Sequence, residues 1–442
     1  MERKETKSIR PTDILVEPDM ISGLPGHVID VILSFLPIIE AVGTSVLSKK
    51  WRNCWRTLPN LVFDPQCVCV ASHDPVVIES KFLRIVYHVL LHHSGPINMF
   101  KIDGFRYISE NLMSDIDEWI LYLVKRSVKE LVLEVCAEEY PYGIPRCLFS
   151  CQSLHRLKLK WGYIRCPKTF EGFKHLKSLD LNMVQVEQDD LENLISSCPL
   201  LEDLTLSRLE DLQEITIHAP NLKFFKLYGE FESISFDNTY QLTAISIELH
   251  MQFEFEGNQS ILHGHSSNLL KFLDHQPCIQ SLEIHSHFLK YLATGVVPLE
   301  LPTPCINLRY LSLFINLDDL NQISAVLCLL RSSPNLKTLE IFVEESWFRE
   351  QNVLSTPDSY NWEDIFSEPV MSLGMQYVTI NNISGFKDEI ELIRFLLLYS
   401  PGLKKMIVKP KLLFSLELKT KLIQFKRASE KVEVIYDGED YL

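Results

Sequence analysis

The side chains best suited to chemistry in this sequence are histidines, cysteines and acidic pairs, and they occur in small, scattered groups. A zinc site needs about four ligands, usually as two closely spaced pairs, and the one C-x-C motif has no second pair at zinc spacing. We therefore expect buried thiols, solvated or packed histidines and acidic caps or turns, with no metal and no cofactor. These groups are Cys67 with Cys69, His92 with His93, His263 with His265, His285 with His287, Asp189 with Asp190, and Asp318 with Asp319.

His285 and His287 form the pair with the best geometry for a ligand. Residues i and i+2 of a strand point to the same face of a sheet, so that two histidines at this spacing can chelate one ion. A packed or solvated pair is the simpler interpretation. The sequence has no glycine-rich phosphate loop, no G-x-S-x-G motif and no H-E-x-x-H motif. We therefore expect no catalytic activity.

A basic and aromatic segment, LSKKWRNCW at residues 47–55, suits four roles: a nucleic-acid contact, a targeting signal, core, or a docking surface. Trp51 and Trp55 stand at helical spacing within it. The whole chain carries a formal charge of −15, and residues 1–60 hold eight Lys/Arg against seven Asp/Glu. Nucleic-acid binding needs clustered basic residues, so we expect no nucleic-acid partner. A nuclear-localisation signal stays open, and one helix shared by core and docking surface is favoured.

The composition, 46% hydrophobic and 23% charged, is that of an ordinary folded protein. The first twenty residues are charged and lack the apolar core of a secretory signal, and no apolar run reaches the length of a membrane span. The eleven scattered cysteines then indicate reduced thiols. We expect a cytoplasmic protein, a nuclear one, or both, with no membrane partner.

One six-residue pattern recurs along the chain: an apolar residue, two spacers, an apolar residue, one spacer and a final apolar residue. Its last three residues alternate, which places two apolar side chains on one face of a strand. Copies mostly 21–28 residues apart leave room for a helical or irregular return, which is the leucine-rich-repeat unit. We predict an α/β fold in which stacked units form a curved, irregular solenoid. Copies begin at residues 128, 154, 176, 201, 222, 242, 279, 308 and 336, with looser ones at 97, 212 and 403.

The segments between the copies support this prediction. Apolar residues at i, i+3, i+4 and i+7 predict helices near residues 116–123, 191–198 and 323–330, the second capped by Asp189 or Asp190. Prolines precede several copies. Because a proline pushes the residue before it out of the helical region, each marks a corner between helix and strand. They are Pro199, Pro277, Pro334 and Pro401.

Residues 19–60 do not follow the repeat. LPGHVIDVILSFLP sets apolar residues at helical spacing and ends at Pro37, and the following IIEAVGTSVLSKKWRNCW predicts two further short helices. Three short helices in about forty residues are too small to bury this much apolar surface. Either the solenoid or another protein must cover the excess.

The segment DMISGLPGHVIDVILSFLPIIEAVGTSVLSKKWRNCWRTLPNLVFD, at residues 19–64, resembles an F-box of the plant type. The resemblance rests on Leu24-Pro25, ILSFLP, TSVLS and KKWRNCW in order and register. The segment departs from the family at Gly26-His27, where an acid is common, and at Ile38-Ile39, where a polar and a basic residue are common. Gly43 inside the second helix costs about 0.5–1 kcal/mol against alanine.

Residues 360–437 are similar to the FBD module that follows leucine-rich repeats in many plant F-box proteins, through GFKDEIEL and LLLYSPGLKKMIV. The pattern predicts a strand at 377–380, an amphipathic helix with Ile390, Ile393 and Leu397, a strand at 406–408, and a last helix and strand. Such a unit would cap the end of the repeat core. The expected domains are a flexible N-terminus at 1–18, the F-box at 19–64, the solenoid at 65–359 and the FBD-like cap at 360–437.

The family resemblance implies a substrate-recognition subunit of an SCF-type (cullin-RING) E3 ubiquitin ligase that is itself non-catalytic. The F-box would bind a Skp-type adaptor, and through it a cullin. The solenoid would hold an unknown target protein near the ubiquitin donor. The sequence does not separate adaptor contacts from residues that support the fold. The adaptor-binding set is Leu24, Pro25, Ile29, Ile32, Leu33, Leu36, Pro37, Val42, Val46, Leu47, Lys50, Trp51 and Trp55.

One alternative belongs to another class: a non-ligase leucine-rich-repeat interaction scaffold whose degenerate F-box has lost the adaptor. The departures at Gly26, Ile38-Ile39 and Gly43 favour it. A small ligand in the solenoid is a third hypothesis, which no convergent basic cluster in the sequence supports. Side chains beside the strands would choose the target, and their mixed charges indicate no single ligand class. Examples are Glu202, Lys223, Glu283, Arg309 and Glu340.

Overall fold

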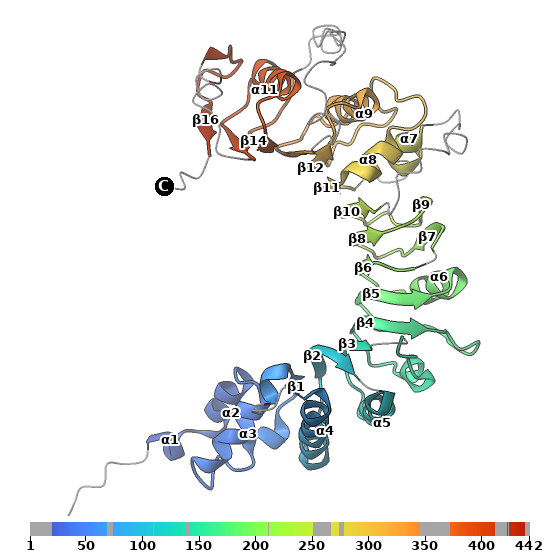
Figure 1. Cartoon of the computed structure of the whole chain (residues 1–442), viewed down its shortest axis with the longest axis vertical. Coiled ribbons are helices and arrows are strands. Elements are labelled where there is room, and N and C mark those ends of the chain that lie inside the picture. Colours follow the sequence, from blue (N-terminus) through green and yellow to red (C-terminus); the bar gives the residue numbers. More distant parts are fainter. Residues whose placement is uncertain are drawn as a thin grey trace, which may run out of the picture. The chain divides into compact units, whose positions relative to one another are not determined.

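The computed structural model divides the chain into two compact units, a first at Met1–Gly104 and a second at Phe105–Leu442 (Figure 1). Within the described residues, no helix is both long and apolar enough to cross a lipid bilayer. The structure describes residues 20–68, 74–108, 110–137, 141–210, 212–250, 267–273, 278–344, 372–411, 422 and 424–437.

Short helices build the start of the first unit. α2 (Gly26–Ser34) begins after Pro25 and α3 (Ile38–Gly43) begins after Pro37, as the sequence predicts. Proline suits the start of a helix because its fixed φ is helical and its missing N–H would have no partner there. A four-residue helix, α1 (Met20–Gly23), precedes them, and the 3₁₀ turn η1 (Thr44–Val46) follows α3.

The single helix predicted over residues 47–55 is wrong. Turns and the 3₁₀ helix η2 (Cys54–Thr57) stand in its place. Trp51 reaches across the unit, where its Nε1 donates to the carbonyl of Ile21 at 3.1 Å. A backbone held by such a distant contact does not follow the local spacing of the sequence, and tertiary structure overrides propensity.

α4 (Pro75–His92) and a pair of parallel strands complete the first unit. Asp74 caps α4 by accepting from the N–H of Val76 at 3.0 Å. β1 (Asn60–Phe63), followed by the 3₁₀ turn η3 (Pro65–Cys67), pairs with the start of β2 (Met99–Ile108). Rings from β1, α4 and β2 meet in the core, with centroids 6.3 Å apart for Phe63 and Phe82 and 5.5 Å apart for Phe63 and Phe100.

The second unit is built on one open parallel sheet. From β3 to β16 its strands follow chain order, with β7 and β9 left out, and buried leucines of neighbouring strands lie side by side, as in Leu157, Leu179 and Leu204. The copies of the sequence pattern are confirmed as strands, and each copy begins two residues before its strand. The strands are β3 (Glu130–Ala137), β4 (Arg156–Ile164), β5 (Ser178–Val186), β6 (Asp203–Ser207), β8 (Phe224–Gly229), β10 (Ala244–Leu249), β11 (Ser281–Ile284), β12 (Tyr310–Ile315), β13 (Thr338–Val343), β14 (Tyr377–Ile383), β15 (Lys405–Pro410) and β16 (Glu433–Tyr436).

A small second sheet interrupts this regularity. β7 (Glu214–His218) and β9 (Ser233–Asp237) pair in parallel with each other and not with the main sheet. The copy at residue 212 is therefore a strand, but of the smaller sheet. Sequence patterning missed β9, in which Ile234 is the one buried strand position.

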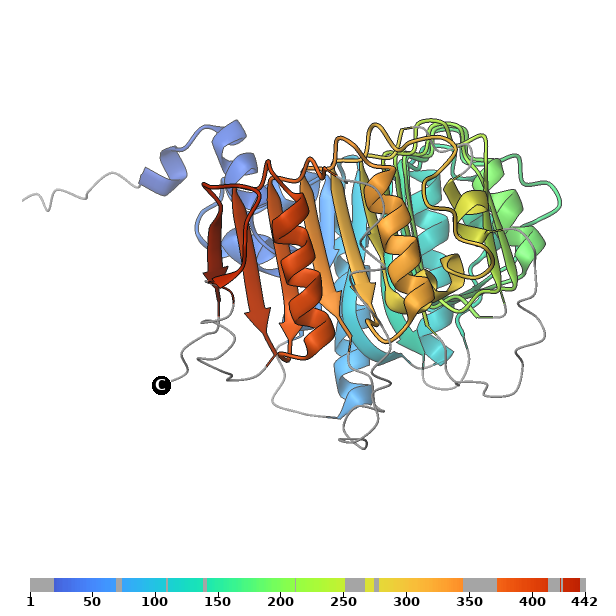
Figure 2. The same cartoon turned by 90° about the horizontal axis from the view of Figure 1, so that it is seen from above.

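The helices of the second unit lie on one face of the main sheet, and Figure 2 shows α9 and α11, in orange and red, against its strands. We call the opposite face, on which Figure 1 shows no described helix of the second unit, the helix-free face. The predicted helices near 116–123, 191–198 and 323–330 are confirmed. The helical elements are α5 (Glu110–Lys125), η4 (Arg146–Ser150), α6 (Gln188–Ser196), α7 (Asn268–Leu273), α8 (Ser286–Leu292), α9 (Leu320–Arg331) and α11 (Lys387–Tyr399).

Prolines follow three of these helices within a few residues, as predicted. Pro199 comes after α6, Pro334 after α9 and Pro401 after α11, whereas Pro277 lies outside the described residues. The strand, helix and strand predicted at 377–408 are also present, and Val378 of β14 lies beside Met406 of β15. The last predicted strand is β16, and the helix predicted before it falls largely outside the described residues.

Candidate functional site

The predicted adaptor-binding residues fall into three groups by exposure, a division that the sequence alone does not give. Buried side chains support the fold, whereas exposed ones are available to a partner. Both tryptophans belong to the first group. Buried are Ile29, Leu33, Trp51 and Trp55; half-buried are Leu24, Leu36, Pro37 and Val42; exposed are Pro25, Ile32, Val46, Leu47 and Lys50.

Helix α2 is apolar on two faces. Ile29 and Leu33 are fully buried, whereas Val31 and Ile32 are 55% and 37% exposed and Phe35, at the C-terminal cap, is 82% exposed. A helix that packs on one side only usually carries polar residues on the other. The second apolar face of α2 is therefore not accounted for by the core of the first unit.

The turn after η1 exposes two more apolar side chains. Val46 is 88% and Leu47 51% exposed. The basic residues that follow, Lys49, Lys50 and Arg52, are exposed as well. Single hydrophobic residues at a surface are ordinary, but several in so small a unit mark an interaction site. We call Val31, Ile32, Phe35, Val46 and Leu47 the exposed apolar set.

Sequence reasoning missed Val31 and Phe35. The signal was present, because Val28, Val31, Ile32 and Phe35 have the same i, i+3, i+4, i+7 spacing as the stripe that was recognised. Two overlapping stripes on one nine-residue helix indicate an apolar arc wider than one buried face, with His27, Asp30 and Ser34 on the remaining polar side. Exposure then depends on which stripe faces the core, and a pattern alone does not decide that.

The basic and aromatic segment serves as core through its tryptophans and as surface through its lysines. Trp51 and Trp55 are each 3% exposed. Trp55 stacks on His88 of α4 with ring centroids 6.3 Å apart, and the guanidinium carbon of Arg56 lies 5.7 Å from the centre of the Trp55 ring. Lys50 Nζ donates to the carbonyl of Leu24, just before α2. These contacts fix the start of α2, and with it the exposed apolar set.

The groups considered for metal binding have structural partners instead. Among the described residues, no three histidine, cysteine or acidic side chains gather closely enough to hold a metal ion. His92 donates to the carbonyl of His88, and His93 Nε2 lies 2.8 Å from the carbonyl oxygen of Leu58. Asp319 caps α9, as expected, by accepting from the N–H of Asn321 at 3.0 Å. Cys69, His263 and His265 lie outside the described residues.

The cap predicted at Asp189 or Asp190 is wrong, because neither side chain caps α6. The cap position belongs to Glu187, and Asp190 Oδ2 instead accepts from the N–H of Cys166 at 3.2 Å. That carboxylate and burial together raise the pKa of the Cys166 thiol to about 12, with burial the larger cause. Burial raises the pKa of Cys198 to about 11. Thiols held protonated in this way are poor nucleophiles and poor metal ligands.

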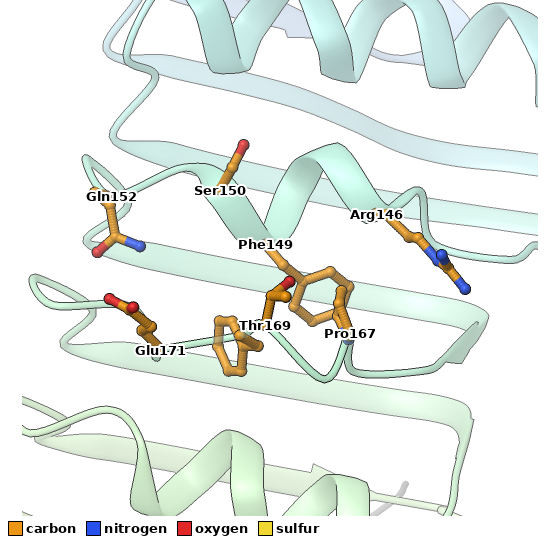
Figure 3. A pocket seen from close by; sticks show the side chains of 8 residues that line it. Arg146, Phe149, Ser150, Gln152, Pro167, Thr169 and Glu171 are labelled. Atoms are coloured by element: carbon orange, nitrogen blue, oxygen red, sulfur yellow. The ribbon is translucent and has the colours of Figure 1, made fainter.

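A cavity of about 300 Å³ lies beside η4 in the second unit. Figure 3 shows Phe149 between Arg146 and Glu171, which lie at opposite ends, and Phe170 also lines the cavity. Opposite charges at opposite ends do not form the convergent cluster that a charged ligand requires. This cavity therefore gives no support to a small-ligand site.

Comparisons with known proteins match the chain to F-box proteins with leucine-rich repeats. A family model described as FBD-associated F-box protein At5g56370, LRR repeats, matches residues 116–341, and an F-box domain model matches residues 21–63. The chain is 36% identical to F-box/FBD/LRR-repeat protein At1g13570 of Arabidopsis thaliana, over 95% of this chain and 98% of that protein. It is 30% identical to F-box/LRR-repeat protein At3g26922 of the same plant, over 66% of this chain and 94% of that protein.

Proposed function

The chain belongs to the plant F-box/FBD/LRR-repeat family, and from that premise we propose that it is the substrate-recognition subunit of an SCF-type (cullin-RING) E3 ubiquitin ligase. The first unit binds a Skp-type adaptor, and through it a cullin, and the second unit binds the target protein. The chain supplies proximity and no catalytic group, because it raises the concentration of target lysines near the ubiquitin donor. Such a subunit works in the cytoplasm, the nucleus or both.

The exposed apolar set is the observation that carries this proposal. Phe35 and Val46 are more than 80% exposed in a unit whose tryptophans are 3% exposed. Removing such side chains from water in an interface is favourable, so their burial against a partner would contribute to the free energy of binding. The adaptor contact is therefore assigned to Pro25, Ile32, Val46, Leu47 and Lys50 of the predicted set together with Val31 and Phe35, and the buried residues support the fold.

The second unit fits the role of target binding. In this proposal the F-box is a three-part unit of α2, α3 and the turn with η2, the repeats curve into a solenoid, and residues 360–437 form an FBD-like cap. A repeat array offers an extended face along which a protein segment can lie. The helix-free face is the side of the sheet on which no described helix of the second unit covers the side chains that such a segment would meet.

A non-ligase scaffold with a degenerate F-box remains the second candidate. It is favoured by α3, which ends after six residues at Gly43, one of the departures from the F-box pattern. The same experiment separates the two candidates, because a scaffold would not retain the adaptor.

A pull-down of purified full-length chain with a purified plant Skp-type adaptor tests the proposal. The wild-type chain is expected to retain the adaptor, and the variant Phe35→Asp/Val46→Asp is expected to lose at least about 30-fold in affinity, since centrally buried apolar anchors dominate binding. Leu91→Asp is the matched control, because Leu91 on α4 of the same unit is 82% exposed. A wild-type chain that fails to retain the adaptor refutes the ligase subunit, and equal losses in both variants refute the assigned surface.

A further inference from the structure

The helix-free face carries an aromatic row across neighbouring strands of the second unit. Phe314 of β12 lies beside Phe342 of β13, and His285 follows β11 directly. The centroids of His285 and Phe314 are 4.0 Å apart with planes at 12°, and those of Phe314 and Phe342 are 4.3 Å apart at 8°. All three side chains are half-buried. Parallel rings on adjacent strands turn their faces to one another, so the row presents ring edges as a narrow apolar ridge.

Carboxylates lie along this ridge. Glu248 Oε2 is 3.5 Å from His285 Nδ1, and Glu283 Oε1 is 3.5 Å from His285 Nε2. Glu340 accepts from the hydroxyl of Tyr310 at 2.9 Å. The Glu248 and Glu283 side chains are 42% and 39% exposed. Within the described part of the chain, no lysine or arginine nitrogen lies within 4 Å of these three carboxylates.

Neutral donors help to hold two of these carboxylates in place. Ser246 Oγ donates to Glu283 at 2.9 Å, and Asn381 Nδ2 donates to Glu340 at 3.1 Å. Hydrogen bonds from His285 and then from Ser246 lower the pKa of Glu283, and the charge of Lys226 adds to the effect. Glu283 is therefore ionised at neutral pH, and its hydrogen bonds hold it in position before any partner arrives.

Earlier strands of the same face have the opposite arrangement. Lys158 of β4 pairs with Glu134 at 2.8 Å and with Asp180 at 3.3 Å. Glu202, just before β6, is paired with Lys177 at 3.0 Å and Lys223 at 2.8 Å. These carboxylates have lysine partners, whereas Glu248, Glu283 and Glu340 have no lysine or arginine nitrogen within 4 Å in the described part of the chain.

We propose that the ridge and its carboxylates bind an extended basic segment of the target protein. The aliphatic stems of lysine or arginine lie across the ring edges of His285, Phe314 and Phe342, and their charged ends meet Glu248, Glu283 and Glu340. Each of Glu283 and Glu340 stands two residues before a ring of the ridge, a separation of about 6.6 Å along a strand. The stem of a lysine is long enough to cover this distance. Three strand intervals of about 4.8 Å, from β10 to β13, match about four residues of an extended segment.

This inference rests on the proposed role of the second unit in target binding, and it can fail while adaptor binding by the first unit stands. The probe is a fluorescein-labelled nonapeptide of alternating lysine and alanine, measured by fluorescence anisotropy with the full-length chain at about 0.15 M salt. The variant Glu248→Gln/Glu283→Gln/Glu340→Gln is expected to bind the peptide about tenfold more weakly than the wild type. Adaptor retention by this variant is expected to be unchanged.

A second triple variant separates the site from net charge. Glu214→Gln/Glu230→Gln/Glu232→Gln removes the same number of charges from exposed residues near β7 and β9. It is expected to change peptide binding less than about twofold, since these three residues lie on or beside β7, β8 and β9 and are not carboxylates of the ridge. Equal losses in the two triple variants would show general attraction to an acidic protein and overturn the proposal. Equal binding of a peptide with glutamate in place of lysine would overturn it as well.

Phe342→Leu tests the ridge without changing charge. Leucine keeps much of the buried volume but shortens the stack, so the lysine peptide is expected to bind about threefold more weakly. Single substitution Glu283→Gln, which is nearly isosteric, provides the check if the triple variant folds poorly. If both single variants bind the lysine peptide as tightly as the wild type, the ridge does not contact the peptide.

Discussion

The two units place apolar side chains in opposite ways. In the second unit, leucines such as Leu157, Leu179 and Leu204 repeat in register and are 2% exposed or less. In the first unit, Phe35 and Val46 are 82% and 88% exposed although both stand in strongly apolar segments. The first unit also relies on long-range side-chain contacts, such as Trp51 to the Ile21 carbonyl, where the second relies on strand pairing.

The difference follows from how each core is completed. A repeat array closes its core with the neighbouring strand and helix, so every leucine of the pattern finds a partner within the chain. A unit with short helices buries a smaller fraction of its surface, and apolar residues beyond the capacity of its core stay outside. An exposed apolar residue therefore indicates a partner more strongly in the first unit than in the second.

Trp51→Ala is expected to give the largest effect and to show how strongly the first unit depends on a few contacts. Losing the buried ring and its hydrogen bond to the Ile21 carbonyl lowers the free energy of unfolding of this unit by about 3–5 kcal/mol. Hydrogen exchange of the α2 amides measures the change, and adaptor retention should fall with it. Phe35→Ala, as control, should leave exchange within about 0.5 kcal/mol of the wild type. Similar exchange in both variants would contradict the division into support and contact.

Gly172→Ala tests the tightness of the second unit. Gly172 has φ +89°, and a Cβ there would come 1.7 Å from the carbonyl oxygen of Ser197. The left-handed backbone and the clash together are expected to cost about 2–4 kcal/mol, seen in hydrogen exchange of β5 and α6. Adaptor retention should not change, because the substitution lies in the other unit. Loss of adaptor binding would show that the two units do not act independently.

Leu24→Ala/Pro25→Ala is expected to have a smaller effect on adaptor binding than charges placed in the exposed apolar set. Leu24 is half-buried and Pro25 exposed, and Pro25 is the N-terminal cap of α2. The double variant loses part of a contact and loosens the start of α2, so we expect affinity for the adaptor to fall about tenfold. If the variant retains as much adaptor as the wild type in a pull-down, Leu24 and Pro25 are not part of the adaptor interface.

The repeats could be predicted from the sequence because their signal is local. Each copy of the pattern begins two residues before its strand, since the same alternation that defines the copy also defines the buried face. The pairing of β7 with β9 could not be predicted, because which strands join a sheet is a property of neighbours far along the chain. A strand with only two alternating apolar residues, Ile234 and Phe236, carries too little signal in the sequence.

The candidate site was less predictable than the fold. Its residues could be found by family resemblance and helical spacing. The apolar arc of α2 is wider than its buried face, however, and only packing decides that Ile29 and Leu33 turn inward while Val31 and Phe35 do not. The helix expected over residues 47–55 fails for a related reason, since the Trp51 contact with Ile21 lies 30 residues away in the chain. Residue spacing predicts which side chains share a face of a helix, but long-range contacts decide which face is buried.

Gly43→Ala is expected to give the smallest effect, and it bears on the degenerate-F-box alternative. Gly43 is the last residue of α3, and a Cβ built there meets no atom within 4 Å. Alanine should therefore stabilise the end of α3 by up to about 0.5 kcal/mol, because it lowers the entropy lost on folding without a clash. If glycine at this position is only a tolerated departure from the F-box pattern, hydrogen exchange of α3 slows slightly and adaptor retention stays equal or rises. A fall in adaptor retention with normal exchange would instead place the backbone of Gly43 in the contact, and would move the interface from the exposed apolar set toward the end of α3.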